Sequence, residues 1–502
     1  MASENMTYCG PAEPTQVHAK RGPRESIYEI GSAGLSAHSV PSAGVSAPDP
    51  SSYFGTLSRG EAPGLPEVGE IEVMRHYTHL ANMNFGVDTG MYPLGSCTMK
   101  YNPRINEATA ALAGFASLHP ATPADASQGA LRLMYELQSD LSAISGFAAT
   151  TLQPAAGAHG EFTALMVFRA AHTAKGNPRK KVIIPDTAHG TNPATVSMCG
   201  YEVVAIPSNE QGGIDLDALK AVLDEDTAAF MLTNPNTVGM FEPRILEITE
   251  AVHAVGAYAY CDGANLNALL GIARPGDMGF DALHINLHKT FSTPHGGGGP
   301  GAGPVCVTEE LAPFLPGPLV VKADGAYALQ APDQSIGRVR SFVGNFGILV
   351  RAYTYIKTNG ADGLRLCGEQ AVISPNYLRV KLDDVFDVAY DRPCMHEFVI
   401  SGSRQKREHG VRTLDVAKRL LDYGFHPPTV YFPLLVEEAL MIEPTETEAL
   451  VELDAFIETM RAIAAEIESD PELVKGAPYS TPVKRLDEAG AARNPNLRWK
   501  RS

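Results

Sequence analysis

The sequence Asp281-Ala282-Leu283-His284-Ile285-Asn286-Leu287-His288-Lys289 joins a short apolar run to a basic side chain directly after it. The run 281–286 has the length and composition of a buried β-strand, and glycines 296–299 follow closely. A lysine in this position can attack a carbonyl group if its surroundings lower its pKa and free the amine. Because most lysines are solvated surface charges, the rest of the chain must show whether a site surrounds Lys289.

Similar strand patterns recur upstream of this stretch, with helical patterns between several of them. Strands are predicted at 181–185, 201–207, 228–233 and 257–262 as well as 281–286, and helices at 127–146, 158–175, 216–223 and 244–255. This alternation is typical of a mostly parallel sheet covered by helices on both faces. In such sheets ligands bind at the carboxyl ends of the strands, which is where the polar residues of this chain gather.

Those polar residues match the needs of a protein that binds pyridoxal phosphate. Lys289 supplies an amine for a Schiff base, Asp262 an acid for the pyridine nitrogen, and His189 a flat ring that can stack on the cofactor. The small residues that begin the helix at 158 leave backbone amides free to approach the phosphate. The predicted cofactor contacts are therefore Lys289, Asp262, His189, Gly157, Ala158, His159, Ala264, Asn236, His288 and Thr290.

The loop 90–103 brings hydroxyl groups and an amine together between glycines and prolines. Its polar residues are Ser96, Cys97, Thr98 and Lys100. The loop is either a surface turn or a segment that offers these groups to an anion, and the residue types alone favour neither reading.

Composition excludes several classes of function. A net charge of −17 and a pI of about 5.3 argue against nucleic acid or an anionic membrane as partner. Seven scattered cysteines without a CxxC pair argue against a disulfide framework and a zinc site. His284 and His288 lack a third ligand, so no metal is expected. The glycine tract lacks the GK[ST] ending of a Walker loop, which argues against nucleotide binding by this tract. No apolar run has membrane-spanning length, and a soluble, cytoplasmic protein is expected.

Four segments are predicted along the chain. Residues 1–64 form a disordered or extended arm, 65–126 an N-terminal segment with the loop 90–103, 127–345 the large domain, and 346–502 a linking helix with a small domain. The second segment begins with a helix at 68–82, whose candidate buried residues are Ile71, Met74 and Leu80. The last segment is predicted to hold helices at 345–358, 412–423 and 446–469 and strands at 397–401 and 440–443.

Six motifs in order along the chain resemble glycine dehydrogenase (decarboxylating), the P-protein of the glycine cleavage system. They are YPLGSCTMKYNP from Tyr92, LQPAAGAHGE from Leu152, DTAHGTNPAT from Asp186, LTNPNTVGMFE from Leu232, CDGANLNALLG from Cys261 and NLHKTFSTPHGGGGPGAGP from Asn286. The resemblance covers roughly residue 65 to the carboxyl terminus and corresponds to the lysine-bearing half of the long single-chain form. In length, the chain is similar to the separately encoded subunit 2. Where many relatives have Asn-Ser-Gly-Ala-Gln, residues 155–159 here read Ala-Ala-Gly-Ala-His, which puts a side-chain contact to the phosphate in doubt.

The resemblance implies a fold of the aspartate-aminotransferase type, with a mostly parallel seven-stranded sheet and a smaller C-terminal α/β domain. It implies an α2β2 assembly with subunit 1. Lys289 would hold pyridoxal phosphate, glycine would lose its carboxylate as carbon dioxide, and the aminomethyl group would pass to the lipoyl arm of the H-protein. The loop from Ser96 to Lys100 would anchor the glycine carboxylate or meet the lipoyl arm.

Two other functions remain open on the sequence alone. One is a different enzyme of the same fold, such as an amino-acid decarboxylase or a cysteine desulfurase, for which Cys97 is the loop nucleophile available. The other is an assembly subunit without catalysis, against which the presence of Lys289, Asp262 and His189 argues.

Overall fold

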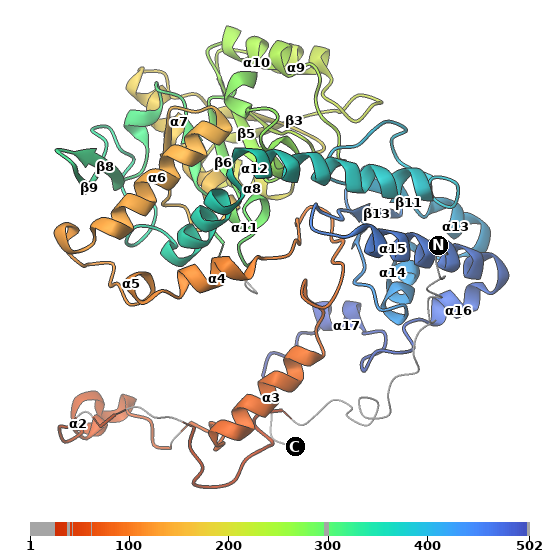
Figure 1. The fold of residues 1–502 in the computed structure, drawn as a ribbon, viewed down its shortest axis with the longest axis horizontal. Helices are drawn as coiled ribbons and strands as arrows, with labels where there is room; N and C mark the ends of the chain where they lie inside the picture. The colour runs from red at the N-terminus through yellow and green to blue at the C-terminus, as the bar shows by residue number, and fades with distance from the viewer. Residues whose placement is uncertain (1–25, 38–40, 43, 62, 296–300, 499–502) are drawn as a thin grey trace, which may run out of the picture. The chain divides into compact units, whose positions relative to one another are not determined.

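The computed structural model describes residues 26–37, 41–42, 44–61, 63–295 and 301–498. These residues form two compact units (Figure 1). The smaller unit comprises the described residues up to Thr89, residues 421–424 and the described residues from Gly476 onward. The larger comprises Gly90–Leu420 and Phe425–Lys475 and contains every described candidate functional residue. The glycine tract 296–299 and residues 1–25 of the arm lie outside the described residues.

A seven-stranded sheet forms the centre of the larger unit, in the order β1-β7-β6-β5-β4-β2-β3. Its neighbouring strands are parallel except at β7, which runs antiparallel to both β6 and β1. The five strands predicted for this part of the chain are confirmed, each to within one residue at either end. The strands are β1 (Ala149–Thr151), β2 (Lys181–Pro185), β3 (Glu202–Ile206), β4 (Thr227–Thr233), β5 (Tyr258–Gly263), β6 (Ala282–Ile285) and β7 (Val305–Val307).

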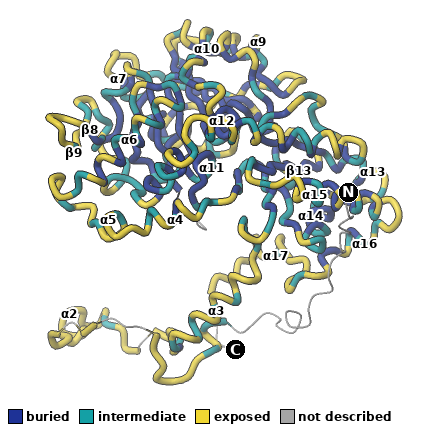
Figure 2. The backbone as a smooth tube through the Cα atoms, in the orientation of Figure 1, coloured by how far each residue is buried: buried dark blue, intermediate teal, exposed yellow. Residues whose placement is uncertain are grey.

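Helices cover both faces of this sheet, as the alternating pattern predicted, so the central strands β4, β5 and β6 are buried on both sides (Figure 2). Because successive side chains point to opposite faces, Phe230 and Leu232 of β4 pack with α6, α9, α10 and α12, whereas Ala229 and Met231 pack with α7 and α8. The helices are α6 (Gln128–Ser145), α7 (Gly157–Ala174), α8 (Thr191–Met198), α9 (Leu216–Val222), α10 (Ile245–Ala254) and α12 (Phe346–Leu382).

The ring of Phe230 is fully buried in the hydrophobic core between the sheet and the helices α6, α9, α10 and α12. Replacement of Phe230 by alanine is expected to lower the free energy of unfolding by about 3–5 kcal/mol, because the lost apolar contacts leave a cavity. Urea unfolding followed by circular dichroism measures this loss. Leu246→Ala, at a side chain that is 63% exposed on α10, serves as control and should change stability by less than about 0.5 kcal/mol. Equal losses in the two variants would contradict the placement of Phe230.

A second, four-stranded antiparallel sheet has the order β10-β11-β13-β12 and follows α12 in the chain. The non-helical Gly360 divides α12 into two helical segments, and we propose this helix as the link between the large and small domains. The strands are β10 (Asp387–Val388), β11 (Phe398–Ser401), β12 (Thr429–Val430) and β13 (Ala439–Ile442), and the nearby helices are α13 (Ser403–His409), α14 (Thr413–Asp422), α15 (Leu450–Ser469) and α16 (Pro471–Gly476).

The remaining elements are short or lie in the smaller unit. They are α2 (Pro50–Phe54), α3 (Glu70–Asn82), α4 (Arg104–Ala110), α5 (Ala113–Ala116), α11 (Leu287–Thr290), α17 (Glu488–Arg493), the hairpin strands β8 (Leu319–Ala323) and β9 (Ala326–Gln330), and the 3-10 helices Gly55–Leu57, Ala124–Ala126, Leu266–Leu269, Pro275–Met278 and Ala312–Phe314. The hairpin and the helices after α15 were not predicted. None of the helices in the described part of the chain has the length and apolar character needed to cross a membrane.

The helix α3 corrects one prediction of burial. Ile71, Met74 and Leu80 were expected to be buried but are 53%, 61% and 38% exposed. Their spacing does produce an apolar stripe, but α3 buries no residue. A helical pattern indicates that a face is apolar without indicating what covers it.

Candidate active site

A pocket of about 460 Å³ opens at the carboxyl ends of the central strands. It is the place at which parallel sheets of this kind bind ligands. The pocket combines carboxylates, imidazoles and one lysine with small residues. Its lining residues are Ser96, Gly157, Ala158, Glu161, His189, Thr191, Thr233, Thr237, Asp262, Ala264, Asn265, His284, Asn286 and Lys289.

Lys289 lies in the short helix α11, directly after β6. Its Nζ reaches across the pocket and donates a hydrogen bond of 2.8 Å to the carbonyl oxygen of Ser96. The predicted amine therefore faces the pocket, and a backbone carbonyl from the loop 90–103 fixes its direction.

Asp262 lies in β5, one residue before its end, and is 4% exposed. Its Oδ1 accepts from the backbone amide of Ala264 (3.0 Å) and its Oδ2 from Nδ2 of Asn192 (3.1 Å), while Nε2 of His284 lies 3.5 Å from Oδ1. Burial alone would raise the pKa of Asp262, but His284 and these hydrogen bonds outweigh it and lower the pKa. The carboxylate is thus an ionised group held in a fixed direction at the base of the pocket.

Glu161 is a second buried carboxyl in the pocket, and the sequence reasoning missed it. It comes from α7 and is 4% exposed. Nδ2 of Asn192 donates both to Oε2 of Glu161 (2.9 Å) and to Asp262, so one amide bridges the two carboxyls. Burial, followed by the charge of Asp262, raises the pKa of Glu161 to about 8. Glu161 is therefore protonated at neutral pH, whereas Asp262 is ionised.

The raised pKa of Glu161 predicts how stability depends on pH. Between about pH 4.5, the ordinary value, and about pH 8 the folded protein keeps a proton that the unfolded chain has released. The folded state therefore loses stability as pH rises through this window, by at most about 1.4 kcal/mol per pH unit. Glu161→Gln does not titrate, so its stability relative to the unsubstituted protein is expected to rise with pH across the window. Denaturant unfolding at several pH values measures this difference.

Glu202, exposed on β3, provides the control for that experiment. The difference between Glu202→Gln and the unsubstituted protein should show no matching rise over the same window, because that substitution leaves the buried carboxyl of Glu161 in place. A difference for Glu161→Gln that stays constant from about pH 5 to about pH 9 would contradict the buried, protonated carboxyl.

His189 lies between β2 and α8, at the exposed side of the pocket. Its Nδ1 is 3.0 Å from Oγ1 of Thr191, and its ring meets that of Phe432 edge to face, with centroids 5.8 Å apart. Burial and then the charge of Lys289 lower the pKa of His189, so the ring is neutral. These contacts hold a flat, uncharged ring beside the pocket.

The amino terminus of α7 also faces the pocket, through Gly157 and Ala158. A Cβ atom at Gly157 would lie 2.4 Å from Nδ2 of Asn286, so only glycine fits there. Nδ1 of His159 accepts from the amide of Ala155 (3.1 Å), and its ring does not line the pocket. The contribution of this segment is thus backbone at the start of an 18-residue helix, whose dipole favours an anion.

The structure places other predicted cofactor contacts beside the pocket rather than in its lining. Asn236 donates to the carbonyl of Gly212 (2.6 Å) and accepts from the amide of Met240 (2.9 Å), within the loop after β4. Thr290 is buried, and its hydroxyl has no hydrogen-bond partner among the described residues. His288 packs edge to face against His295, and burial, assisted by that imidazole, lowers its pKa to about 3.

The loop 90–103 contributes Ser96 to the pocket, but the other three polar residues have partners elsewhere. Thr98 donates from Oγ1 to Oε1 of Glu443 (2.6 Å). Lys100 is buried, pairs with Glu446 and donates to the carbonyl of Thr290 (2.8 Å). The Cys97 carbonyl accepts from Nε2 of His295 (2.9 Å), and burial raises the pKa of its thiol.

Comparison with known proteins places this architecture in a family. Residues 367–478 match the family model for the C-terminal domain of glycine dehydrogenase, and residues 160–319 match the class-V aminotransferase model. A solved glycine decarboxylase (P-protein) of the glycine cleavage system, in inhibitor-bound form, shares the fold. Its TM-score is 0.70 at 20% identity, over 82% of this chain and 94% of that one. A NifS-like protein aligns with a TM-score of 0.57 at 16% identity, over 75% of this chain and 99% of that one.

Sequence relatives are much closer than these structures. A probable glycine dehydrogenase (decarboxylating) subunit 2 of Listeria innocua is 57% identical over 95% of this chain and 98% of its own length. The protein of the same name from Caldanaerobacter subterraneus is 57% identical over 94% of this chain and 98% of its own length. Identity at this level over nearly the whole of both chains confirms the resemblance carried by the six motifs. The chain therefore belongs to the glycine dehydrogenase (decarboxylating) subunit 2 family.

Proposed function

We propose that this protein decarboxylates glycine, using pyridoxal phosphate held by Lys289. The observation that carries the proposal is the convergence of Lys289, Asp262 and His189 on one pocket, in a chain 57% identical to relatives named for this reaction. No single residue of the three would suffice, because each type also occurs in purely structural settings.

The residues present fit the cofactor. The pocket offers an amine, an ionised carboxylate fixed by Asn192 and Ala264, and a helix start at Gly157, a residue without a side chain. Bound pyridoxal phosphate supplies an electron sink that accepts the electron pair left behind when the glycine carboxylate departs as carbon dioxide. In this proposal Lys289 forms the covalent link, and the amino end of α7 binds the phosphate through its backbone amides.

The protein's own groups then have separate tasks. Asp262, whose pKa is lowered, stays ionised and holds a proton on the ring nitrogen. His189 is neutral and stacks on the ring without adding positive charge. Ser96 directs the amine of Lys289 through its carbonyl. Direct contacts from Ala264, Asn236, His288 and Thr290 to the cofactor remain predictions, as does a role of Thr98 or Lys100 toward the glycine carboxylate.

We further propose that the partners are subunit 1, in an α2β2 assembly, and the lipoylated H-protein, which receives the aminomethyl group. The name of the relatives, subunit 2, supports the first partner. A cytoplasmic location is part of the same proposal, and the free cysteines among the described residues agree with a reducing compartment.

Glycine-dependent exchange of labelled carbon dioxide tests the proposal. The protein, combined with subunit 1 and lipoylated H-protein, is expected to exchange label with glycine and to lose this activity when either partner is omitted. Exchange with other amino acids but not with glycine would contradict the proposed substrate.

A cysteine desulfurase is the competing activity, because a solved cysteine desulfurase shares the fold. Such an enzyme attacks through a cysteine thiolate, but burial raises the pKa of Cys97 and keeps it as a thiol. Incubation with cysteine and analysis for alanine and sulfide should therefore yield no product, and formation of alanine would favour the desulfurase.

A further inference from the structure

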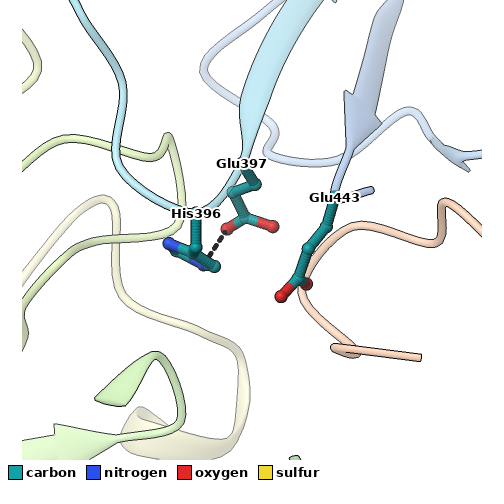
Figure 3. A group of neighbouring side chains, drawn as sticks. All are labelled: His396, Glu397 and Glu443. Atoms are coloured by element: carbon teal, nitrogen blue, oxygen red, sulfur yellow. Dashed lines mark ion pairs between the residues drawn. The ribbon is translucent and has the colours of Figure 1, made fainter. Parts of the chain in front are cut away.

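Two buried carboxylates lie behind the loop that faces Lys289, and the proposed reaction assigns them no role. Glu397 directly precedes β11, and Glu443 directly follows β13. Because Phe398 pairs with Ile442 in this antiparallel ladder, both carboxylates project from the same end of the small sheet (Figure 3). Their exposed fractions are zero, as is that of the neighbouring His396.

Both carboxylates bind the backbone of the loop. Oε2 of Glu397 accepts from the amide of Ser96 (2.6 Å), and Oε2 of Glu443 accepts from the amide of Thr98 (2.9 Å). Oε1 of Glu443 also accepts from the Thr98 hydroxyl (2.6 Å). Two alternate amides of one short loop are therefore each fixed by an oxygen of a buried carboxyl group.

The loop needs such fixing because its backbone is strained. Ser96 and Thr98 adopt left-handed conformations, with φ of +68° and +49°. A left-handed backbone is unfavourable at a residue with a Cβ and persists only where the surroundings impose it. The preceding Gly95 packs so closely that a Cβ there would lie 2.2 Å from Cγ of Met441.

Ser96, one of the two residues with a left-handed backbone, also contacts Lys289. The amide of Ser96 is bound by Glu397, and the carbonyl of the same residue accepts from Nζ of Lys289 at 2.8 Å. The amide of Ser96 lies in the Gly95–Ser96 peptide plane and the amide of Thr98 in the Cys97–Thr98 plane. Fixing both planes restricts the Ser96–Cys97 peptide between them, which carries the carbonyl that contacts Lys289. The small sheet is thereby connected to the reactive amine through two hydrogen bonds.

Charge supports the same connection. Nε2 of His396 lies 3.1 Å from Oε1 of Glu397. When this imidazole is protonated, it is a cation beside the two buried acidic side chains. Burial would lower the pKa of His396, but Glu397 outweighs it and raises the pKa. Burial raises the pKa of Glu443, although the charge of His396 opposes that effect.

We propose that Glu397 and Glu443 are positioning residues for Lys289, holding the loop 96–98 so that the Ser96 carbonyl directs the amine. His396 acts as the counter-charge of Glu397. This inference rests on the proposed function only in taking Lys289 as the reactive group.

Three substitutions separate geometry from charge. Glu397→Ala removes both the acceptor for the Ser96 amide and the charge, whereas Glu397→Gln keeps an acceptor oxygen and removes the charge. Glu443→Gln does the same at Thr98. Glu437→Gln, at a side chain that is 71% exposed just before β13, is the control. Other titratable groups around Lys289 are common to all variants and cancel in the comparison; they are Glu161, Asp262, Cys97, His189, His284, His288 and His295.

The first readout is hydrogen exchange at the amides of residues 96 and 98, measured by mass spectrometry on the full chain. Exchange is expected to be at least about tenfold faster in Glu397→Ala and near the original rate in Glu397→Gln. The second is the rate at which an amine-selective reagent labels Lys289 at a fixed pH. The rate is expected to rise at least about threefold in Glu397→Ala and to stay near the original value in Glu397→Gln and Glu437→Gln, because only the alanine variant releases the Ser96 carbonyl that holds the amine.

These readouts do not require glycine turnover, so failure of this inference and failure of the proposed function are distinguishable. A variant set that loses thermal stability while the loop exchange and the labelling rate of Lys289 stay unchanged would reduce the carboxylates to a structural role. His396, Glu397 and Glu443 also have the ligand types and proximity of a metal site, with candidate ligand atoms within 4.8 Å of one another. Stoichiometric metal in the purified protein that Glu443→Gln abolishes would overturn the inference in favour of such a site.

Discussion

Lys289→Ala is expected to abolish the visible absorbance of bound pyridoxal phosphate and to reduce glycine-dependent carbon dioxide exchange by about 10³-fold or more. The amine provides the covalent link to the cofactor, and its loss removes both that link and a proton acceptor. The absorbance spectrum of the purified variant, recorded after dialysis, measures the first loss. Exchange assays with subunit 1 and H-protein present measure the second.

Two further variants make this result specific to the amine. Lys289→Arg keeps a positive charge but cannot form a Schiff base, so it should lose the absorbance as well. Lys220→Ala, at an exposed lysine of α9, should keep both absorbance and exchange. Lys100 cannot replace Lys289, because it is buried and paired with Glu446. A Lys289→Ala protein that retained the absorbance would place the covalent link at another residue.

The sequence alone indicates the main features of the large sheet, and the reason is local. A two-residue period and apolar composition mark each strand, and a parallel sheet brings the ends of its strands to one edge. The rule predicts that Asp262 and Lys289 lie close together, because each lies at or just after the end of a strand. The comparisons confirm the family and the fold, while the individual roles of these residues stay predictions.

The groups that surround these residues could not be predicted, because they come from distant parts of the chain. Ser96 contacts Glu397 across 301 positions, and Thr98 contacts Glu443 across 345. No local pattern carries such a pairing. Glu161 lies in a motif that was recognised, yet only the packing of α7 against β5 and β6 brings its carboxyl to Asp262. Glu161 lies one helical turn after Gly157 and therefore on the same face of α7, and this spacing is the signal that the sequence offers.

A contact between distant residues also explains why the last predicted helix begins later than expected. The last predicted helix began at residue 446, but α15 begins at Leu450. The side chain of Glu446 instead pairs with Lys100, which is buried. A buried lysine needs a partner carboxylate, and that requirement outweighs the helical propensity of the intervening residues.

Asp262→Asn is the second substitution with a large expected effect. Asparagine has the same shape and can still accept from the amide of Ala264, so the fold should be retained. It carries no charge, however, and cannot hold a proton on the ring nitrogen of the cofactor. Carbon dioxide exchange is expected to fall by about 10²–10⁴-fold, the range typical for loss of a positioned acid or base. Asp281→Asn, at the opposite end of the sheet beside His253, should leave the exchange rate unchanged.

The same substitution has a consequence that does not depend on turnover. Burial, followed by the charge of Asp262, raises the pKa of Glu161 to about 8. Asp262→Asn removes that charge, so the pKa of Glu161 should fall and its proton should be released at lower pH. The decline in stability with rising pH then ends at a lower pH than in the unsubstituted protein. Between about pH 6 and about pH 8, the free energy of unfolding should therefore fall less steeply with pH in the variant. An unchanged slope would mean that the two carboxyls do not interact, although Asn192 donates to both.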